Sequence, residues 1–274
     1  PYTFHMKKML LIILTAGLFS ASIAQTAKPT VQNLKPQSSL SAERLKTADQ
    51  VIQGWADKGW MNGGVGLILR NGKVEYYKAF GYENLEKKTP MRTDHIFRIA
   101  SQTKAITSTA VMMLFEEGKF LLDEPVSKFI PEFKNPKVLD KFNAADSSYT
   151  TIPAKREISI RDLLTHTSGI GYAQIGSSTA KAMYAKNGVV GGIGVKDINL
   201  AENIKRLGAL PLFHHPGEKY LYGLNTDVLG YLVEVVSGMT LDEFFRKRIF
   251  DPLGMKDTYF YLPADKKQRL VSLY

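Results

Sequence analysis

A serine and a lysine stand three residues apart in Ser101-Gln102-Thr103-Lys104. On a helix this spacing places both side chains on one face, where the lysine amine can take the proton of the serine hydroxyl. To act as a base at neutral pH, a lysine needs its pKa lowered by about 3 units from about 10.4, which burial and nearby positive charge can achieve. The pair therefore predicts a nucleophile and its base in acyl-enzyme chemistry.

The same spacing recurs in Ser178-Thr179-Ala180-Lys181, so spacing alone is a weak signal. Ser101 lies where a strand-rich region gives way to an apolar helical pattern, whereas Ser178 is expected to lie in a Gly-, Ser- and Ala-rich loop. A helix start favours developing negative charge, and apolar flanks desolvate a lysine. We therefore expect Ser101 and Lys104 to react. The alternative interpretation is a serine helix cap followed by an exposed lysine.

The sequence around these residues resembles a known family: class C serine β-lactamases, D-alanyl-D-alanine carboxypeptidases and the carboxylesterases that share their fold. The resemblance runs from about residue 60 to 274. It rests on four stretches, residues 98–104, 121–126, 158–169 and 216–231. It implies that Ser101 is the nucleophile, Lys104 its base and Tyr222 a proton relay, with a structural role for His166. It also implies an α/β (α+β) fold of the β-lactamase/transpeptidase kind, with an antiparallel sheet, flanking helices and an all-α subdomain.

One position departs from the family pattern. β-Lactamases and carboxypeptidases of this family usually carry Asn two residues after the tyrosine, but Leu224 stands there and Asn225 comes one residue later. One residue on a helix turns a side chain by about 100 degrees, so Asn225 is not expected to substitute. This favours a carboxylesterase. A D-alanyl-D-alanine carboxypeptidase or class C-like β-lactamase, and a non-catalytic penicillin-binding or sensor module, remain as alternatives.

A third family motif, Lys or His with Gly two residues on, is not found after Tyr222. By resemblance, we expect the chain to be C-terminally truncated, with an incomplete sheet and without the strand that supplies the second oxyanion donor. Losing one such donor costs about two to three powers of ten in rate. Residues 25–274 alone are therefore expected to be inactive, and measurable turnover would contradict this.

Periodicity and turn residues predict the elements that position these groups. Asn71-Gly72 should join strands over 64–70 and 73–80, because this dipeptide readily adopts positive φ angles. We divide the chain into 41–100, a helix and a hairpin, and 101–274, the nucleophile helix and a mainly helical subdomain. The apolar pattern after Arg98 predicts a helix buried on most faces that ends at Gly118. Other helices are expected over 42–60, capped by Ser41, and over 159–165, 200–207, 226–237 and 241–250, with a glycine-rich loop over 188–194.

The first 24 residues are excluded from the fold. Met6, Lys7 and Lys8 precede an apolar run that closes on Ala21-Ser22-Ile23-Ala24, which predicts a signal peptide cut before Gln25. Residues 25–40 are expected to form a flexible linker. The protein should then be exported, periplasmic or secreted, with no stable membrane span after cleavage. A retained N-terminal anchor is the alternative.

Composition excludes several other classes. The formal charge is +10, but basic residues are scattered among acids and no basic run is interleaved with aromatics, so nucleic acid is not expected as a partner. There is no cysteine. Adjacent histidines such as His214 and His215 rarely converge on one metal ion, and we expect no metal or cofactor to be required. The expected partner is a small-molecule ester, a β-lactam or a cell-wall peptide, and the sequence carries no signal for an oligomeric state.

Overall fold

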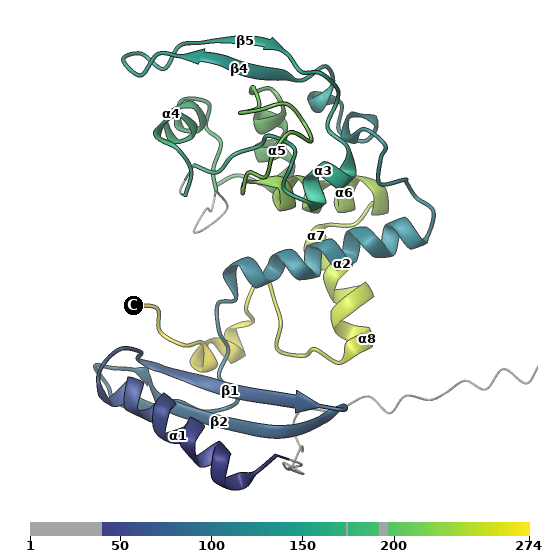
Figure 1. Cartoon of the computed structure of the whole chain (residues 1–274). Helices are drawn as coiled ribbons and strands as arrows, with labels where there is room; N and C mark the ends of the chain where they lie inside the picture. Colours follow the sequence, from purple (N-terminus) through teal and green to yellow (C-terminus); the bar gives the residue numbers. More distant parts are fainter. Residues whose placement is uncertain (1–39, 174, 192–196) are drawn as a thin grey trace, which may run out of the picture.

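The computed structural model of the chain describes residues 40–173, 175–191 and 197–274. The predicted signal peptide, and the predicted linker up to residue 39, lie outside the described residues, as does part of the glycine-rich loop. In Figure 1 a small sheet with one helix lies at one end, a group of helices with a second hairpin lies at the other, and α2 runs between them.

The first end is built from α1 (Ala42–Asp57), β1 (Gly63–Arg70), β2 (Lys73–Asn84) and β3 (Thr89–Pro90) in the order β1-β2-β3. Ser41 caps α1, accepting a hydrogen bond from the Arg44 backbone N–H at 3.3 Å. Asn71 and Gly72 have φ angles of 50° and 72°, as the two-residue turn requires. The predicted helix, cap and hairpin are therefore confirmed.

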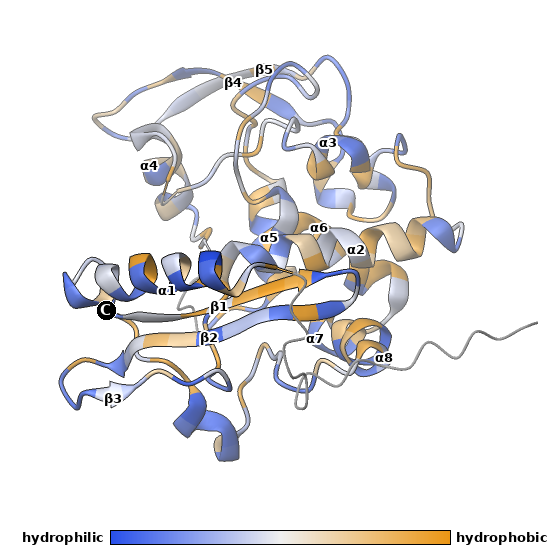
Figure 2. Ribbon diagram, turned by 60° about the horizontal axis from the view of Figure 1, so that its bottom comes forward, coloured by the Kyte–Doolittle hydropathy of each residue, from blue (hydrophilic) through white to orange (hydrophobic). Residues whose placement is uncertain are grey.

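Apolar side chains on this hairpin and helix are less covered than their pattern suggests. Trp55 on α1 is 45% exposed and Leu69 on β1 is 61% exposed. Figure 2 shows the hydrophobic colour along β1. Within the part of the chain that the structure describes, β1 pairs with β2 alone. Its other edge therefore presents unpaired backbone groups, the feature by which strands recruit further strands.

The helix after the hairpin begins with a short 3-10 turn, η2 (Ala100–Gln102), and continues as α2 (Thr103–Glu116). It ends where expected, at Gly118 with a φ of 70°. Its burial is confined to one face, through Thr107, Ala110, Val111 and Leu114, while Met112 is 36% exposed. The prediction of burial on most faces is wrong, because α6 (Asn225–Ser237) and α7 (Leu241–Phe245) cover one face only.

The helical end holds the main core. Its buried side chains include Ile158, Leu163, Met183, Leu232 and Phe244. The predicted helices are present as α3 (Ile160–Leu164), α5 (Leu200–Gly208) and α6. The helix expected over 241–250 is divided into α7 and a π-helical turn, η5 (Arg246–Phe250), and a further short helix, α8 (Asp251–Leu253), follows it. Short 3-10 turns occupy Val126–Lys128, Pro131–Phe133 and Ala264–Arg269.

Two features of this end differ from the prediction. Residues 178–181, expected in a loop, begin α4 (Ser178–Lys186), which is capped by Ser177 and anchored by the buried Met183 and Tyr184. A second hairpin, β4 (Lys137–Phe142) and β5 (Tyr149–Pro153), was not expected. Most residues of these strands are partly or fully exposed, so no alternating apolar pattern marks them.

The last described segment returns to the residues that lead into α2. Ile96 and Leu270 form a parallel bridge, with the Val271 N–H donating to the Ile96 carbonyl at 2.9 Å. Arg98 Nη1 also donates to the Val271 carbonyl at 2.8 Å. The segment just before Ser101 is therefore hydrogen-bonded to a segment about 170 residues later in the chain. Among the described residues, no helix combines the length and apolar character needed to cross a membrane.

Candidate active site

Ser101 lies on a strained turn. The residue before it, Ala100, has a φ of 42°, a left-handed conformation that a residue with a Cβ rarely adopts. The Gln102 N–H closes the turn on the Ile99 carbonyl at 3.0 Å. Strain of this kind persists where the surrounding structure fixes it, and it clusters at functional sites. The Ser101 side chain is exposed at the start of α2.

The three residues predicted from the sequence meet in space. Lys104 Nζ donates to Ser101 Oγ at 3.4 Å, and Tyr222 Oη lies 3.1 Å from the same Oγ. Lys104 Nζ also lies 5.2 Å from the centroid of the Tyr222 ring. The fold therefore brings a tyrosine 121 positions away to the Ser101–Lys104 pair.

The electrostatics favour the tyrosine as a proton carrier. Hydrogen bonds from Ser101 and Lys104 lower the pKa of the Tyr222 hydroxyl, and together they outweigh the opposing effect of burial. The positive charge of Lys104 acts in the same direction. A tyrosinate stabilised in this way can accept the serine proton and return it to a leaving group.

A backbone ladder holds Tyr222 in place. The Leu221 N–H donates to the His166 carbonyl at 2.8 Å and the Leu224 N–H to the Gly171 carbonyl at 3.1 Å, one on each side of the tyrosine. Gly223 lies so close to the neighbouring segment that a Cβ would stand 2.0 Å from the Ile170 carbonyl oxygen. Only glycine fits there, so the residue after Tyr222 is fixed by close approach.

His166 packs against Tyr222, and Asn225 in turn contacts His166. The His166 ring stacks on the Tyr222 ring, with centroids 5.1 Å apart and planes 23° from parallel. Asn225 is fully buried, and its amide contacts His166 Nδ1 at 3.0 Å and Ser168 Oγ at 2.5 Å. Leu224 is also fully buried. The Asn225 amide is therefore engaged inside the fold, as expected from the one-residue shift.

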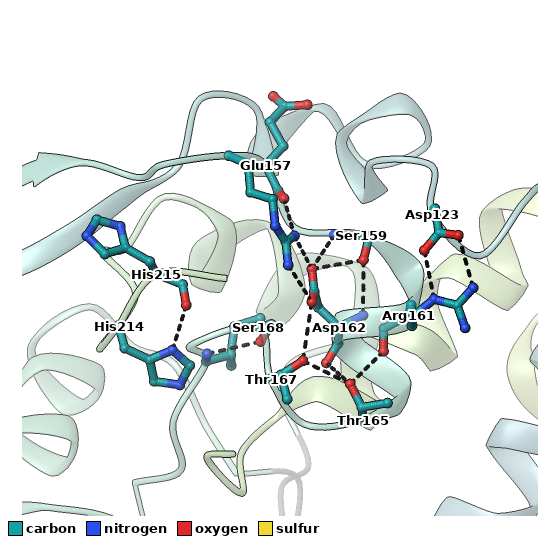
Figure 3. Close-up of polar contacts among 12 residues, drawn as sticks. Asp123, Glu157, Ser159, Arg161, Asp162, Thr165, Thr167, Ser168, His214 and His215 are labelled. Carbon is teal, nitrogen blue, oxygen red and sulfur yellow. Dashed lines mark hydrogen bonds and ion pairs between the residues drawn. The ribbon is translucent and has the colours of Figure 1, made fainter. Parts of the chain in front are cut away.

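An ion pair between the buried Asp162 and the exposed Arg156 anchors the segment that carries His166 (Figure 3). Asp162 accepts from both Arg156 nitrogens, at 2.5 and 2.9 Å, and from the Ser159 N–H at 2.9 Å, and it completes a capping box with Ser159 at the start of α3. Thr167 Oγ1 also donates to Asp162 at 3.2 Å. Burial raises the pKa of Asp162, but these hydrogen bonds outweigh it and hold the pKa below its usual value.

A second carboxyl lies near the candidate site without being part of the prediction. Burial raises the pKa of Asp227, in the first turn of α6, to about 6, and the positive charge of Lys104 opposes this rise. Asp227 in turn raises the pKa of Tyr172 after the larger contribution of burial. In the sequence, Asp227 stands out as an acidic residue within the apolar stretch after Tyr222. No role was assigned to it on that basis.

The competing pair, Ser178 and Lys181, begins α4 rather than a loop, so the predicted contrast in context is wrong in that respect. What separates the pairs is their neighbours: among the described residues, no tyrosine hydroxyl bonds to Ser178, and Ser178 and Lys181 share no hydrogen bond.

The histidine pair His214-His215 does not converge on a common point. His214 Nδ1 donates to the His215 carbonyl at 2.8 Å, and His215 Nδ1 accepts from the Lys155 N–H at 3.3 Å.

The curated relatives of this chain include an esterase and a putative carboxypeptidase. Esterase EstB of Burkholderia gladioli is 35% identical over 237 residues, which are 86% of this chain and 55% of that protein. A putative D-alanyl-D-alanine carboxypeptidase of Escherichia coli is 28% identical over 263 residues, 92% of this chain and 56% of that protein. The chain thus spans about half the length of these curated relatives.

The fold prediction is confirmed by solved structures. EstCE1, described as a hydrolase with promiscuous acyltransferase activity, superimposes with a TM-score of 0.72 and 32% identity over 84% of this chain and 56% of that one. The family model described as Beta-lactamase matches residues 48–274, which include Ser101, Lys104 and Tyr222. By fold, by motif and by relatives, this chain belongs to the beta-lactamase family, the family that its sequence resembles.

Proposed function

We propose that the protein is an exported serine hydrolase that forms an acyl-enzyme on Ser101 and acts mainly on carboxylic esters. The observation that carries this is the position of Ser101 Oγ, within 3.4 Å of Lys104 Nζ and 3.1 Å of Tyr222 Oη. Ser101 Oγ attacks the ester carbonyl carbon while its proton passes to the Lys104–Tyr222 pair. The leaving alkoxide takes that proton as the C–O bond breaks, and water then hydrolyses the acyl-enzyme to the acid.

The preference for esters rests on the residues after Tyr222. Leu224 is buried where the family's amide-binding members usually present an asparagine, and the Asn225 amide is occupied by His166 and Ser168. A site that offers a substrate amide no hydrogen-bond partner does not bind peptides in preference to esters. The name of the relative Esterase EstB supports the same preference.

The second candidate is a D-alanyl-D-alanine carboxypeptidase, supported by the name of the Escherichia coli relative. It shares the nucleophile and differs in the acyl donor. Acyl-D-alanyl-D-alanine peptides and penicillins are therefore the competing substrates in the test.

The test measures acylation of Ser101 by intact-protein mass spectrometry after exposure to p-nitrophenyl butyrate. Acylation is chosen because a single adduct can accumulate on the protein even where a missing oxyanion donor slows turnover by about two to three powers of ten. We expect a butyryl adduct on the wild type and none on Ser101→Ala. Ser178→Ala is the matched control, because Ser178 has the same spacing to a lysine, and it should acquire the adduct like the wild type. An adduct that survives Ser101→Ala would contradict the proposal.

The same assay decides between substrates. We expect the ester to acylate Ser101 at least about tenfold faster than a penicillin or an acyl-D-alanyl-D-alanine peptide, the scale on which a binding pocket discriminates. The reverse order would support the carboxypeptidase, and reversible binding without any adduct would support a non-catalytic binding module.

Export is proposed from residues 6–24 and is tested separately. Residues 6–40 are fused to alkaline phosphatase that lacks its own signal. We expect phosphatase activity outside the cytoplasm and a mature N-terminus at Gln25. An uncut, membrane-retained fusion would support an anchor instead.

A further inference from the structure

A chain of hydrogen bonds ends on the histidine that stacks against Tyr222. The Ile170 N–H donates to Ser168 Oγ at 3.1 Å, so the hydroxyl proton of Ser168 is directed to Asn225 Oδ1, at 2.5 Å. Asn225 Nδ2 then lies 3.0 Å from His166 Nδ1. Ser168 and Asn225 are both fully buried, so water does not compete for these groups.

The orientation of the Asn225 amide is set by its neighbours. The same Nδ2 lies 3.5 Å from the Leu221 carbonyl oxygen, which can only accept. Turning the amide over would bring Oδ1 toward that carbonyl and would leave the Ser168 proton without its acceptor. An amide NH₂ group has no lone pair to offer, so His166 Nδ1 is the acceptor. A neutral imidazole that accepts at Nδ1 carries its proton on Nε2.

The surroundings of His166 act in the same direction. Burial lowers the pKa of His166, and the charge of Lys104 on α2 lowers it further. The titratable rings of Tyr220 and Tyr222 face it from the segment before α6, with centroids 5.8 and 5.1 Å away. α6 itself contributes the uncharged Asn225, and protonation at Nδ1 would set an N–H against the Asn225 N–H.

We propose that Ser168 and Asn225 hold His166 as the neutral Nε2–H tautomer, and that His166 is thereby a positioning residue for Tyr222. The neutral ring supports the tyrosine through stacking without placing a second positive charge beside Lys104. This inference rests on the proposed function, in which Tyr222 relays the Ser101 proton. It adds to that function a reason for the pairing of His166 with Asn225.

The test replaces Asn225 by a carboxylate of the same shape. In Asn225→Asp the new oxygen accepts from a protonated Nδ1, so the pKa of His166, followed by ¹⁵N NMR, should rise by about one unit or more. The resulting cation should lower the pKa of Tyr222. The rise of Ser101 acylation with pH should therefore begin at lower pH than in the wild type, a displacement of the pH profile that a merely structural role would not produce.

Two further variants keep the test decisive. Asn187→Asp makes the same chemical change at the end of α4, where Asn187 Nδ2 donates to the Met183 carbonyl, and it should leave the titration of His166 and the acylation rate unchanged. Ser168→Ala removes the proton that orients the amide. It should yield a mixture of both neutral tautomers of His166, even if Asn225→Asp fails to fold.

The wild-type NMR spectrum alone can overturn the inference. A neutral His166 with its proton on Nδ1 would do so, as would an unchanged pKa of His166 in a folded Asn225→Asp variant. If His166 behaves as expected but wild-type Ser101 acquires no acyl adduct, the tautomer assignment stands and the proposed function falls. The two failures are therefore distinguishable.

Discussion

The hydroxyl of Ser101 has two hydrogen-bonding neighbours, Lys104 and Tyr222, and they can be separated by removing one atom. Tyr222→Phe keeps the ring that stacks on His166 and removes the Oη that lies 3.1 Å from Ser101 Oγ. Because a positioned proton carrier contributes about 10² to 10⁴ in rate, acylation of Ser101 should slow by a factor in that range. The measurement is the rate of adduct formation from p-nitrophenyl butyrate at pH 7 to 10.

The pH dependence of Ser101 acylation gives a second test of the role of Tyr222. Since hydrogen bonds from Ser101 and Lys104 lower the pKa of Tyr222, wild-type acylation should rise with pH and level off below the ordinary tyrosine pKa. The Phe variant should lose this rise. Tyr231→Phe, a partly buried tyrosine later on α6, is the control and should keep the wild-type profile. A Tyr222→Phe variant with wild-type rate and profile would leave Lys104 as the sole base.

At this scale the sequence indicated which three residues meet, but it did not predict all of their contacts. The Ser101–Lys104 spacing was visible directly, whereas Tyr222 was identified through family resemblance, because no local pattern links residues 121 positions apart. The bond between Asn225 and His166 was missed for the same reason. Ser178 and Lys181 were set aside because a loop was expected there, but the structure places both residues in the helix α4.

At the scale of elements, the short helix α3 depends on one buried carboxylate. Asp162 is 7% exposed at its side chain, and it binds Arg156, caps α3 through Ser159 and accepts from Thr167, one residue after His166. Asp162→Ala removes the acceptor of the Ser159 N–H, while Arg156 is 47% exposed and can bind water instead. The change should lower the free energy of unfolding by about 1 to 3 kcal/mol, as expected when a partly buried donor loses its partner. Urea denaturation at pH 7 measures this.

Figure 3 also shows the matched control for this change. Asp123 receives two hydrogen bonds from Arg161, at 2.7 and 3.0 Å, but its side chain is 76% exposed. Asp123→Ala should cost less than about 1 kcal/mol, because water screens an exposed pair. Equal losses for the two variants would show that burial does not decide the strength of the Asp162 pair.

Helices and strands were predictable where a turn or a helix cap within a few residues specifies them. The Asn71-Gly72 turn and the caps at Ser41 and Ser159 act within a few residues, so their hairpin and helices were placed correctly. The β4–β5 hairpin has mixed and exposed positions, and the only large apolar side chains of α4 are the adjacent Met183 and Tyr184, so periodicity marks neither element. In both cases contacts with the core, rather than local sequence, select the element.

At the scale of the whole molecule, one carboxylate ties the last described segment to the chain that leads into Ser101. Asp257 accepts from Lys266 Nζ at 2.5 Å and from two nitrogens of Arg269 at 2.9 and 2.8 Å. Arg269 Nε also donates to the Asp94 carbonyl at 2.8 Å, and the Arg269 carbonyl accepts from the Ile96 N–H at 2.7 Å. Through Arg269, Asp257 therefore helps to hold residues 94–96.

These contacts of Asp257 should make the free energy of unfolding depend on pH. Hydrogen bonds from Arg269, and to a smaller extent from Lys266, lower the pKa of Asp257 from 3.8 to about 2 despite an opposing effect of burial. A carboxyl with a lowered pKa in the folded state stabilises that state above its unfolded pKa, and the contribution disappears as the pH falls through the folded pKa. The contribution of Asp257 should therefore be complete at pH 5 and lost between about pH 4 and pH 2.

Asp257→Asn should remove this dependence. The pKa shift corresponds to about 2.5 kcal/mol, but the side chain is 39% exposed and screening reduces the expected loss at pH 7 to about 1 kcal/mol. Urea denaturation at pH 7, 4 and 2 should show a gap between wild type and variant that narrows toward pH 2. Asp265→Asn, an exposed carboxylate in the same 3-10 turn as Arg269, should show no such narrowing. A gap of constant size at all three pH values would mean that Asp257 acts through packing rather than through its charge.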